Sequence, residues 1–84
     1  MLEQNSRSGN YGTPLKDVNA LAKAIREARK AHGLTQAELA GLSGTGLRFV
    51  NELEHGKPTV SLSKVLAVLA VLGLLVYLLD QDKR

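Results

Sequence analysis

The chain has 84 residues, a formal charge of +3 and no cysteine, and 44% of its residues are hydrophobic. This length fits one domain with a small core, and the lack of cysteine excludes disulfides as its reinforcement. His32 and His55 have no cysteine near them, which argues against a structural metal and leaves oligomerisation as the way to enlarge the core.

Residues 1–13 are polar and glycine-containing, and this composition predicts a disordered N-terminal tail. The tail lacks a basic region followed by an apolar run, so we expect no secretory signal. A helical pattern begins after Asp17, a suitable N-cap, and Gly33 is the residue expected just past the helix end. The sequence therefore predicts a first helix over 18–32, with one buried face formed by Leu21, Ala24, Ile25 and Ala28.

Two short helices follow. Thr35 and Glu38 have the spacing of a capping box, flanked by apolar residues at the positions of a hydrophobic staple, so a helix is expected over 36–42. The next helix starts after Thr45 and runs to His55, before Gly56 and Pro58. Its expected inward stripe is Leu47, Val50, Leu53 and Glu54.

The C-terminal part is strongly apolar. Ser61 or Thr59 caps a fourth helix that Gly73 ends, with apolar positions Leu62, Val65, Leu66, Leu69 and Leu72. The six apolar residues 74–79 are too few for another helix and predict a β-strand. The whole run Val65–Leu79 has fifteen residues, fewer than the roughly 18–20 that span a bilayer as a helix, so a membrane anchor is disfavoured.

Two short helices joined through Ser43-Gly44-Thr45 are typical of a helix-turn-helix. Ala40 is placed where such helices cross, and Gly44 is suited to a left-handed backbone. An ordinary helical hairpin without a ligand fits the same pattern equally well. The pattern alone therefore leaves both interpretations open.

A longer set of residues favours the DNA-binding interpretation. The segments Arg26-x-x-Arg29-x-x-x-Gly33-Leu34-Thr35-Gln36-x-Glu38-Leu39-Ala40 and Asn51-Glu52-Leu53-Glu54-x-Gly56-Lys57, with Gly44 between them, resemble the phage repressor and Cro (Xre) family. The resemblance covers about residues 17–72. It implies an all-α, lambda-repressor-like fold of four to five helices that binds double-stranded operator DNA.

The resemblance also implies roles for individual residues. Gln36 would contact a phosphate or support a side chain that reads a base, and Lys57 would contact the DNA backbone. The side of the third helix expected to face the major groove comprises Thr45, Gly46, Leu47, Arg48 and Asn51. The amino ends of the second and fourth helices would hold phosphates. Arg29 and Glu54 would instead form a partly buried salt bridge with a structural role.

The sequence departs from this family at the start of the recognition helix, where polar side chains are usual. Gly46 and Leu47 offer none, so Leu47 either touches a thymine methyl or packs inward. Arg48 is then the best candidate for reading guanine, with Asn51 second. Specificity from this helix is expected to be sparse, which gives DNA shape a larger part.

One subgroup matches further. The run from Arg48 to Thr59, followed by Lys64-Val65-Leu66 and Leu72-Gly73-Leu74, resembles the small HipB-type antitoxins, which are paired with HipA-like serine/threonine kinase toxins. In that group a C-terminal strand pairs with its two-fold mate and closes a homodimer. Such pairing would remove an exposed apolar edge, and the corresponding residues here are Leu74, Leu75, Val76, Tyr77, Leu78 and Leu79.

The expected protein is thus a dimeric transcriptional repressor in the bacterial cytoplasm, associated with the nucleoid, that represses its own operon and neutralises a kinase toxin. A solitary phage-type or metabolic repressor is the alternative, and a membrane-anchored interaction protein is disfavoured. No nucleophile–base pair, metal cluster or phosphate loop appears, so neither an enzyme nor a cofactor is expected. The expected division is a tail at 1–13, a DNA-binding domain at 14–73, a dimerisation strand at 74–80 and a charged tail at 81–84.

Overall fold

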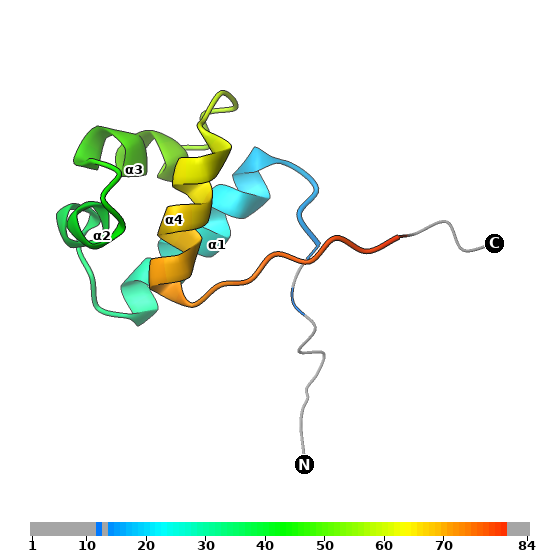
Figure 1. The fold of residues 1–84 in the computed structure, drawn as a ribbon, viewed down its shortest axis with the longest axis horizontal. Helices are drawn as coiled ribbons and strands as arrows, with labels where there is room; N and C mark the ends of the chain where they lie inside the picture. The colour runs from blue at the N-terminus through cyan, green and yellow to red at the C-terminus, as the bar shows by residue number, and fades with distance from the viewer. Residues whose placement is uncertain (1–11, 13, 81–84) are drawn as a thin grey trace, which may run out of the picture.

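The computed structural model describes residue 12 and residues 14–80. Four α-helices lie in this part of the chain, α1 (Val18–Ala31), α2 (Gln36–Ser43), α3 (Leu47–Glu54) and α4 (Leu62–Leu72). Figure 1 shows α2 and α3 together on one side of the molecule, with α4 crossing in front of α1. The expected tail at 81–84, and that at 1–13 apart from residue 12, lie outside the described residues.

The helix boundaries follow from caps that the sequence supplies. The Asp17 carboxylate accepts the Ala20 amide at 2.9 Å, so α1 begins where predicted. Both hydrogen bonds of the capping box between Thr35 and Glu38 are present at the start of α2. Ser61, rather than Thr59, caps α4, since its hydroxyl accepts the Lys64 amide.

The core lies where α2 packs on α3 and α4, and α1 closes it from the other side. Its buried members are Ile25, Leu39, Ala40, Val50, Leu53, Val65, Val68, Leu69 and Leu72. One expectation about its faces is wrong. Leu47, expected in the inward stripe of α3, is 52% exposed, so it does not pack inward with Val50 and Leu53. On α4, Leu62 and Leu66 are exposed, whereas Val68 is buried.

The segment after α4 is the main difference from the predicted fold. Gly73 adopts a left-handed conformation with φ 71°, and the Leu74 amide donates to Leu69 O at 2.9 Å, which ends the helix. Residues 74–80 then leave the helices as an extended chain (Figure 1), and no strand occurs in the described residues. A β-strand requires a second strand to pair with through backbone hydrogen bonds.

The apolar side chains of this segment fall into two groups. Leu74 is half-buried and packs against the core. The following five side chains are exposed, and Leu78 is the most exposed of them at 94%. The fold thus presents an apolar segment that its own helices do not cover.

None of the helices in the described residues is long and apolar enough to cross a membrane.

Candidate DNA-binding face

The turn between α2 and α3 is fixed by local hydrogen bonds. Gly44 is left-handed with φ 70°, and the Thr45 amide donates to Ala40 O at 3.2 Å. The Ser43 hydroxyl bonds Leu39 O and lies 2.8 Å from the Thr45 hydroxyl. Ala40 is buried between the helices, where a small side chain permits their close approach. These contacts fix how α3 projects from the core.

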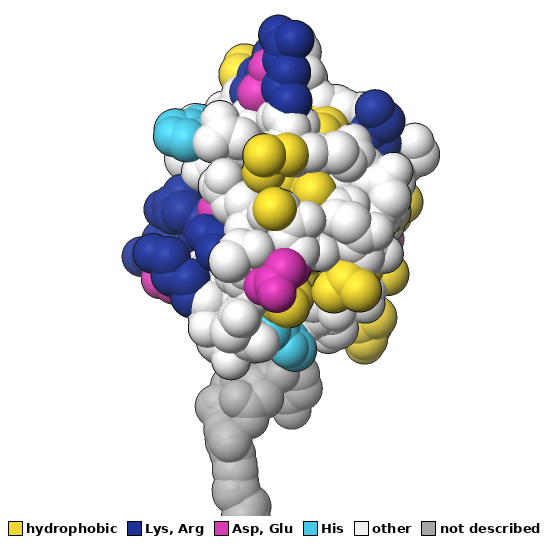
Figure 2. Space-filling model, turned by 90° about the vertical axis from the view of Figure 1, so that its left-hand side faces the viewer, with side chains coloured by type: hydrophobic (Ala, Val, Ile, Leu, Met, Phe, Trp, Pro, Cys, Tyr) yellow, Lys and Arg dark blue, Asp and Glu magenta, His cyan; other side chains and the backbone are white. Residues whose placement is uncertain are grey.

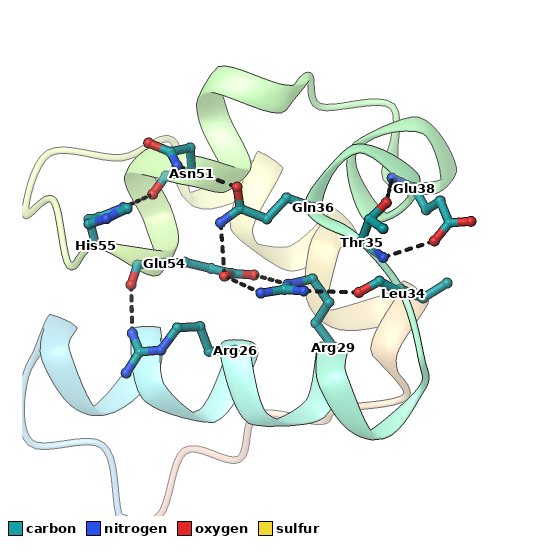
Figure 3. A network of polar contacts seen from close by, with 9 residues as sticks. All are labelled: Arg26, Arg29, Leu34, Thr35, Gln36, Glu38, Asn51, Glu54 and His55. Carbon is teal, nitrogen blue, oxygen red and sulfur yellow. Dashed lines mark hydrogen bonds and ion pairs between the residues drawn. The ribbon is translucent and has the colours of Figure 1, made fainter.

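A polar network around Glu54 joins α1, α2 and α3 (Figure 3). Glu54 is only 2% exposed, and its carboxylate accepts Arg29 Nε at 2.6 Å and Arg29 Nη2 at 3.0 Å. The bidentate geometry matches the guanidinium fork to the carboxylate. Arg29 Nη1 also donates to Leu34 O at 2.9 Å, so this arginine fixes the loop before α2 as well.

Arg26 contributes a contact that was not predicted from the sequence. Its Nη1 donates to Glu54 O at 2.7 Å, so it satisfies a carbonyl at the C-terminal end of α3. Its place in the family motif gave Arg26 no partner. No local signal indicated this partner, which lies 28 residues away along the chain.

The network keeps Glu54 ionised. Burial of the carboxyl raises its pKa, but hydrogen bonds from Arg29 and Gln36, with the charges of Arg29 and Arg26, outweigh burial and lower the pKa below its ordinary value. The hydrogen bond to Glu54 correspondingly raises the pKa of Arg29. The charged pair is therefore the folded-state form at neutral pH.

Acid should destabilise the fold through Glu54. Because its pKa is lower when folded than when unfolded, where it is about 4.3, this stabilisation is fully present at neutral pH. It should be lost as the pH falls from about 4.3 through the folded-state pKa. Denaturant titrations across this range should show the free energy of unfolding declining. The decline should be shallower in Glu54→Gln, and an equally steep decline there would assign it to other carboxyl groups.

Gln36 connects this buried network to the exposed side of α3. Its Nε2 donates to Glu54 Oε1 at 3.0 Å, and its Oε1 accepts Asn51 Nδ2 at 3.3 Å (Figure 3). Asn51 is exposed, whereas Gln36 is half-buried. This geometry favours the second of the two roles considered for Gln36, support for a side chain that reads a base.

The basic candidates share one acidic neighbour. Arg48 Nε donates to Glu52 Oε2 at 3.2 Å, and Lys57 Nζ donates to Glu52 Oε1 at 3.3 Å. The Arg48 side chain is 90% exposed and can reach beyond the surface of α3. No role was predicted for Glu52, although its position four residues after Arg48 on a helix is a usual signal for an ion pair.

The first residues of the recognition segment offer little polar surface. The Thr45 hydroxyl is engaged with Ser43, Gly46 has no side chain, and Leu47 is exposed and available to an apolar partner. Figure 2 faces the side formed by α2 and α3 and shows basic side chains toward its edges, with apolar side chains and an acidic one nearer the centre. Such a face suits phosphate contacts at the edges and few base contacts between them.

The amino ends of α2 and α4 differ from that of α3. Thr35 and Ser61 cap α2 and α4 through their hydroxyls, whereas Gly46 begins α3 without a side-chain cap. The expectation that α2 and α4 hold phosphates remains a prediction.

The fold and this face together define a DNA-binding domain of the helix-turn-helix class. Residues 25–77 match the helix-turn-helix family HTH_3, and the chain belongs to that family. It is an HTH-type transcriptional regulator that binds DNA, and members of this family are regulators rather than enzymes, as predicted.

Comparisons with individual proteins agree. The chain is 47% identical over 68 residues to the uncharacterized HTH-type transcriptional regulator y4mF of Sinorhizobium fredii, a match that covers 81% of this chain and 86% of that protein. Among solved structures, chains of a HipA–HipB–O2–O3 complex and of a HipB–O4 20mer complex are similar, each with TM-score 0.76 and 25% identity. Each match covers 84% of this chain and 100% of the other.

Proposed function

We propose that this regulator is a sequence-specific, dimeric repressor that acts as the antitoxin of a HipBA-like operon, autoregulating that operon and neutralising a HipA-like serine/threonine kinase. It would act in the bacterial cytoplasm on the nucleoid. The domain division expected from the sequence is part of this proposal, with DNA binding at 14–73 and dimerisation at 74–80.

The observation that carries DNA reading is the chain of contacts from Arg29 through Glu54 and Gln36 to Asn51. These contacts connect the exposed side-chain amide of Asn51 on α3 to the buried ion pair, which holds the amide in place. Asparagine is suited to bidentate contact with adenine. Arg48 lies one turn earlier on the same helix and is suited to guanine. We assign Thr45, Gly46 and Leu47 to the same interface and Lys57 to a phosphate.

Dimerisation is supported by the exposed apolar segment after Gly73. Pairing of two copies of residues 74–79 would supply the hydrogen bonds that a strand needs and would cover its apolar side chains. Two recognition helices related by a two-fold axis would then meet a palindromic operator. Its half-sites would lie about one helical turn apart, roughly 34 Å, or a multiple of that spacing.

The antitoxin role is supported by similarity to chains of complexes that contain HipB, one of which also contains HipA. The test is copurification of the tagged chain with the product of a neighbouring kinase-like gene, followed by footprinting of its upstream DNA with and without that product. A stable complex that still protects the DNA is expected. A neighbourhood without such a gene, or a kinase-like protein that does not bind, would contradict the antitoxin role.

A solitary repressor without a toxin is the second candidate. The similarity to y4mF, at 47% identity, supports a role as an HTH-type transcriptional regulator. This candidate makes the same predictions for DNA binding and dimerisation and differs only in the kinase.

Arg48→Ala tests the assignment of a base contact. Specific binding should weaken by roughly 1–3 kcal/mol, while binding to random DNA stays nearly unchanged, because a base contact contributes only at the correct sequence. Titrations of both duplexes at one fixed salt concentration measure the two losses. Equal losses on both duplexes would reassign Arg48 to a phosphate.

Lys57→Ala should behave differently, because a phosphate contact is independent of sequence. Binding should weaken on both duplexes, and the slope of log K against log salt should decrease in magnitude by about one unit. Titrations at several salt concentrations measure the slope. An unchanged slope would remove Lys57 from the DNA backbone.

A further inference from the structure

Glu52 is an acidic residue on the face assigned to DNA. Its two carboxylate oxygens bind the two exposed cations proposed to contact the nucleic acid, Oε2 to Arg48 and Oε1 to Lys57. The hydrogen bonds from Arg48 and then from Lys57 lower the pKa of Glu52, so it is ionised at neutral pH. A negative charge at this place opposes binding to phosphates, and its contribution to folding is small because exposed ion pairs stabilise little.

The geometry of the Arg48 contact indicates what the carboxylate does. The bond is made through Nε at 3.2 Å, whereas Arg29 binds its carboxylate through both Nε and Nη2. Among the residues that the structure describes, Glu52 therefore binds the guanidinium of Arg48 only through Nε. The two terminal nitrogens, Nη1 and Nη2, remain available to donate to DNA. A parallel pair of donors is what bidentate contact with O6 and N7 of guanine requires.

Holding the side chain also has an energetic consequence. Arginine has a long, flexible side chain, and fixing it on DNA costs conformational entropy. A side chain already held by Glu52 loses less of this freedom on binding. An Arg48 retained by Glu52 is also less able to turn to a nearby phosphate.

We propose that Glu52 is a positioning residue that aims Arg48 at one base pair and that its charge weakens binding to other sequences. This inference rests on the proposed sequence-specific DNA binding by α3. Glu52 would therefore increase the difference in affinity between the correct and incorrect sequences. It would do so without touching a base itself.

The test compares Glu52→Ala with the parent on two duplexes, the sequence that the parent selects from a randomised pool and a scrambled version. Binding to the selected duplex should weaken, and binding to the scrambled one should strengthen. The ratio of affinities should fall by roughly fivefold or more, the lower end of what one bidentate arginine–guanine pair supplies. Thermal melts of both proteins would check that the variant is folded. Glu27→Gln, which removes a negative charge from α1 instead, controls for the change in net charge.

Arg48 provides the second half of the test. Starting from Arg48→Ala, the further change Glu52→Ala should alter the ratio by less than about twofold, because there is no longer an arginine to position. Both substitutions should relax the preference at the same base pair when site selection is repeated. A purely structural role for Glu52 would not relax the preference at that particular base pair.

Other outcomes would overturn the inference. If Glu52→Ala strengthened binding to both duplexes equally, Glu52 would be only a repulsive charge that Arg48 leaves on binding DNA. If Glu52→Ala left the affinity ratio unchanged, Glu52 would not position Arg48. The same would follow if Glu52→Ala lowered the ratio as much in the Arg48→Ala background as in the parent. A parent protein that selects no sequence at all would instead contradict the proposed function.

Discussion

Replacing Glu54 with alanine should lower the free energy of unfolding by roughly 3–5 kcal/mol, because it leaves the partner charge of a buried ion pair uncompensated. The Arg29 side chain is 11% exposed and would lose both of its hydrogen bonds to the carboxylate. Gln36 would lose its bond to the same group, so the link to Asn51 would loosen as well. Chemical denaturation monitored by circular dichroism measures the loss.

Glu52→Ala is the matched control, since it removes a carboxylate from the same helix that is paired with Arg48 and Lys57 at the surface. Exposed pairs are worth about 0–1 kcal/mol, so its stability should stay close to that of the parent. A Glu54→Ala protein that unfolds like the parent but fails to bind DNA would show that Glu54 acts at the DNA and not in the fold.

Removing the C-terminal apolar segment should abolish the dimer and, with it, tight operator binding. Burial of one leucine-sized side chain is worth about 1.5–3 kcal/mol, and several are exposed after Leu74. Losing several of them together would exceed the stability reserve of a small domain. Truncation after Gly73 tests this, and truncation after Leu74 is sharper, since Leu74 packs on the core and its amide closes α4.

Val76→Pro tests the same segment without shortening it, because proline removes a donor from a paired strand. Sedimentation should show a monomer or an aggregate for each variant, and footprints should vanish at concentrations where the parent protects both half-sites. Leu62→Gln, at another exposed leucine, should leave the dimer intact.

A truncated chain that remains dimeric and protects both half-sites would place the interface elsewhere. On the apolar pattern of α4, Val68 and Val71 would be candidates for that interface. Val68 is fully buried, so it cannot form such an interface. The exposed Leu62 and Leu66 on the same helix would be the residues to test.

The helix ends were predictable because they are decided locally. The capping box at Thr35 and Glu38 and the glycines at 44 and 73 act within a few residues of themselves, and each is found as the sequence indicates. The family resemblance, and not the spacing, supplied the pairing of Arg29 with Glu54, which are 25 residues apart. The bond between them is observed.

What the sequence did not predict depends on packing between elements. The apolar residues of α4 are so dense that periodicity could not choose its buried face, which includes Val68 and excludes Leu62. The hydrogen bond from Arg26 to Glu54 O could not be predicted, because it depends on how α1 packs against α3. The strand expected at 74–79 does not occur in the described residues, because a β-strand forms only against a second strand that bonds to it.

Footprinting of the DNA upstream of its own gene tests the central claim most directly, namely that this regulator reads DNA sequence as a dimer through α3. The parent protein, titrated at fixed salt, should protect two related half-sites whose centres lie about 34 Å apart or a multiple of that distance. Both should become protected together. Protection of a single isolated half-site would contradict the dimer, and uniform coverage without any preferred site would contradict sequence-specific binding.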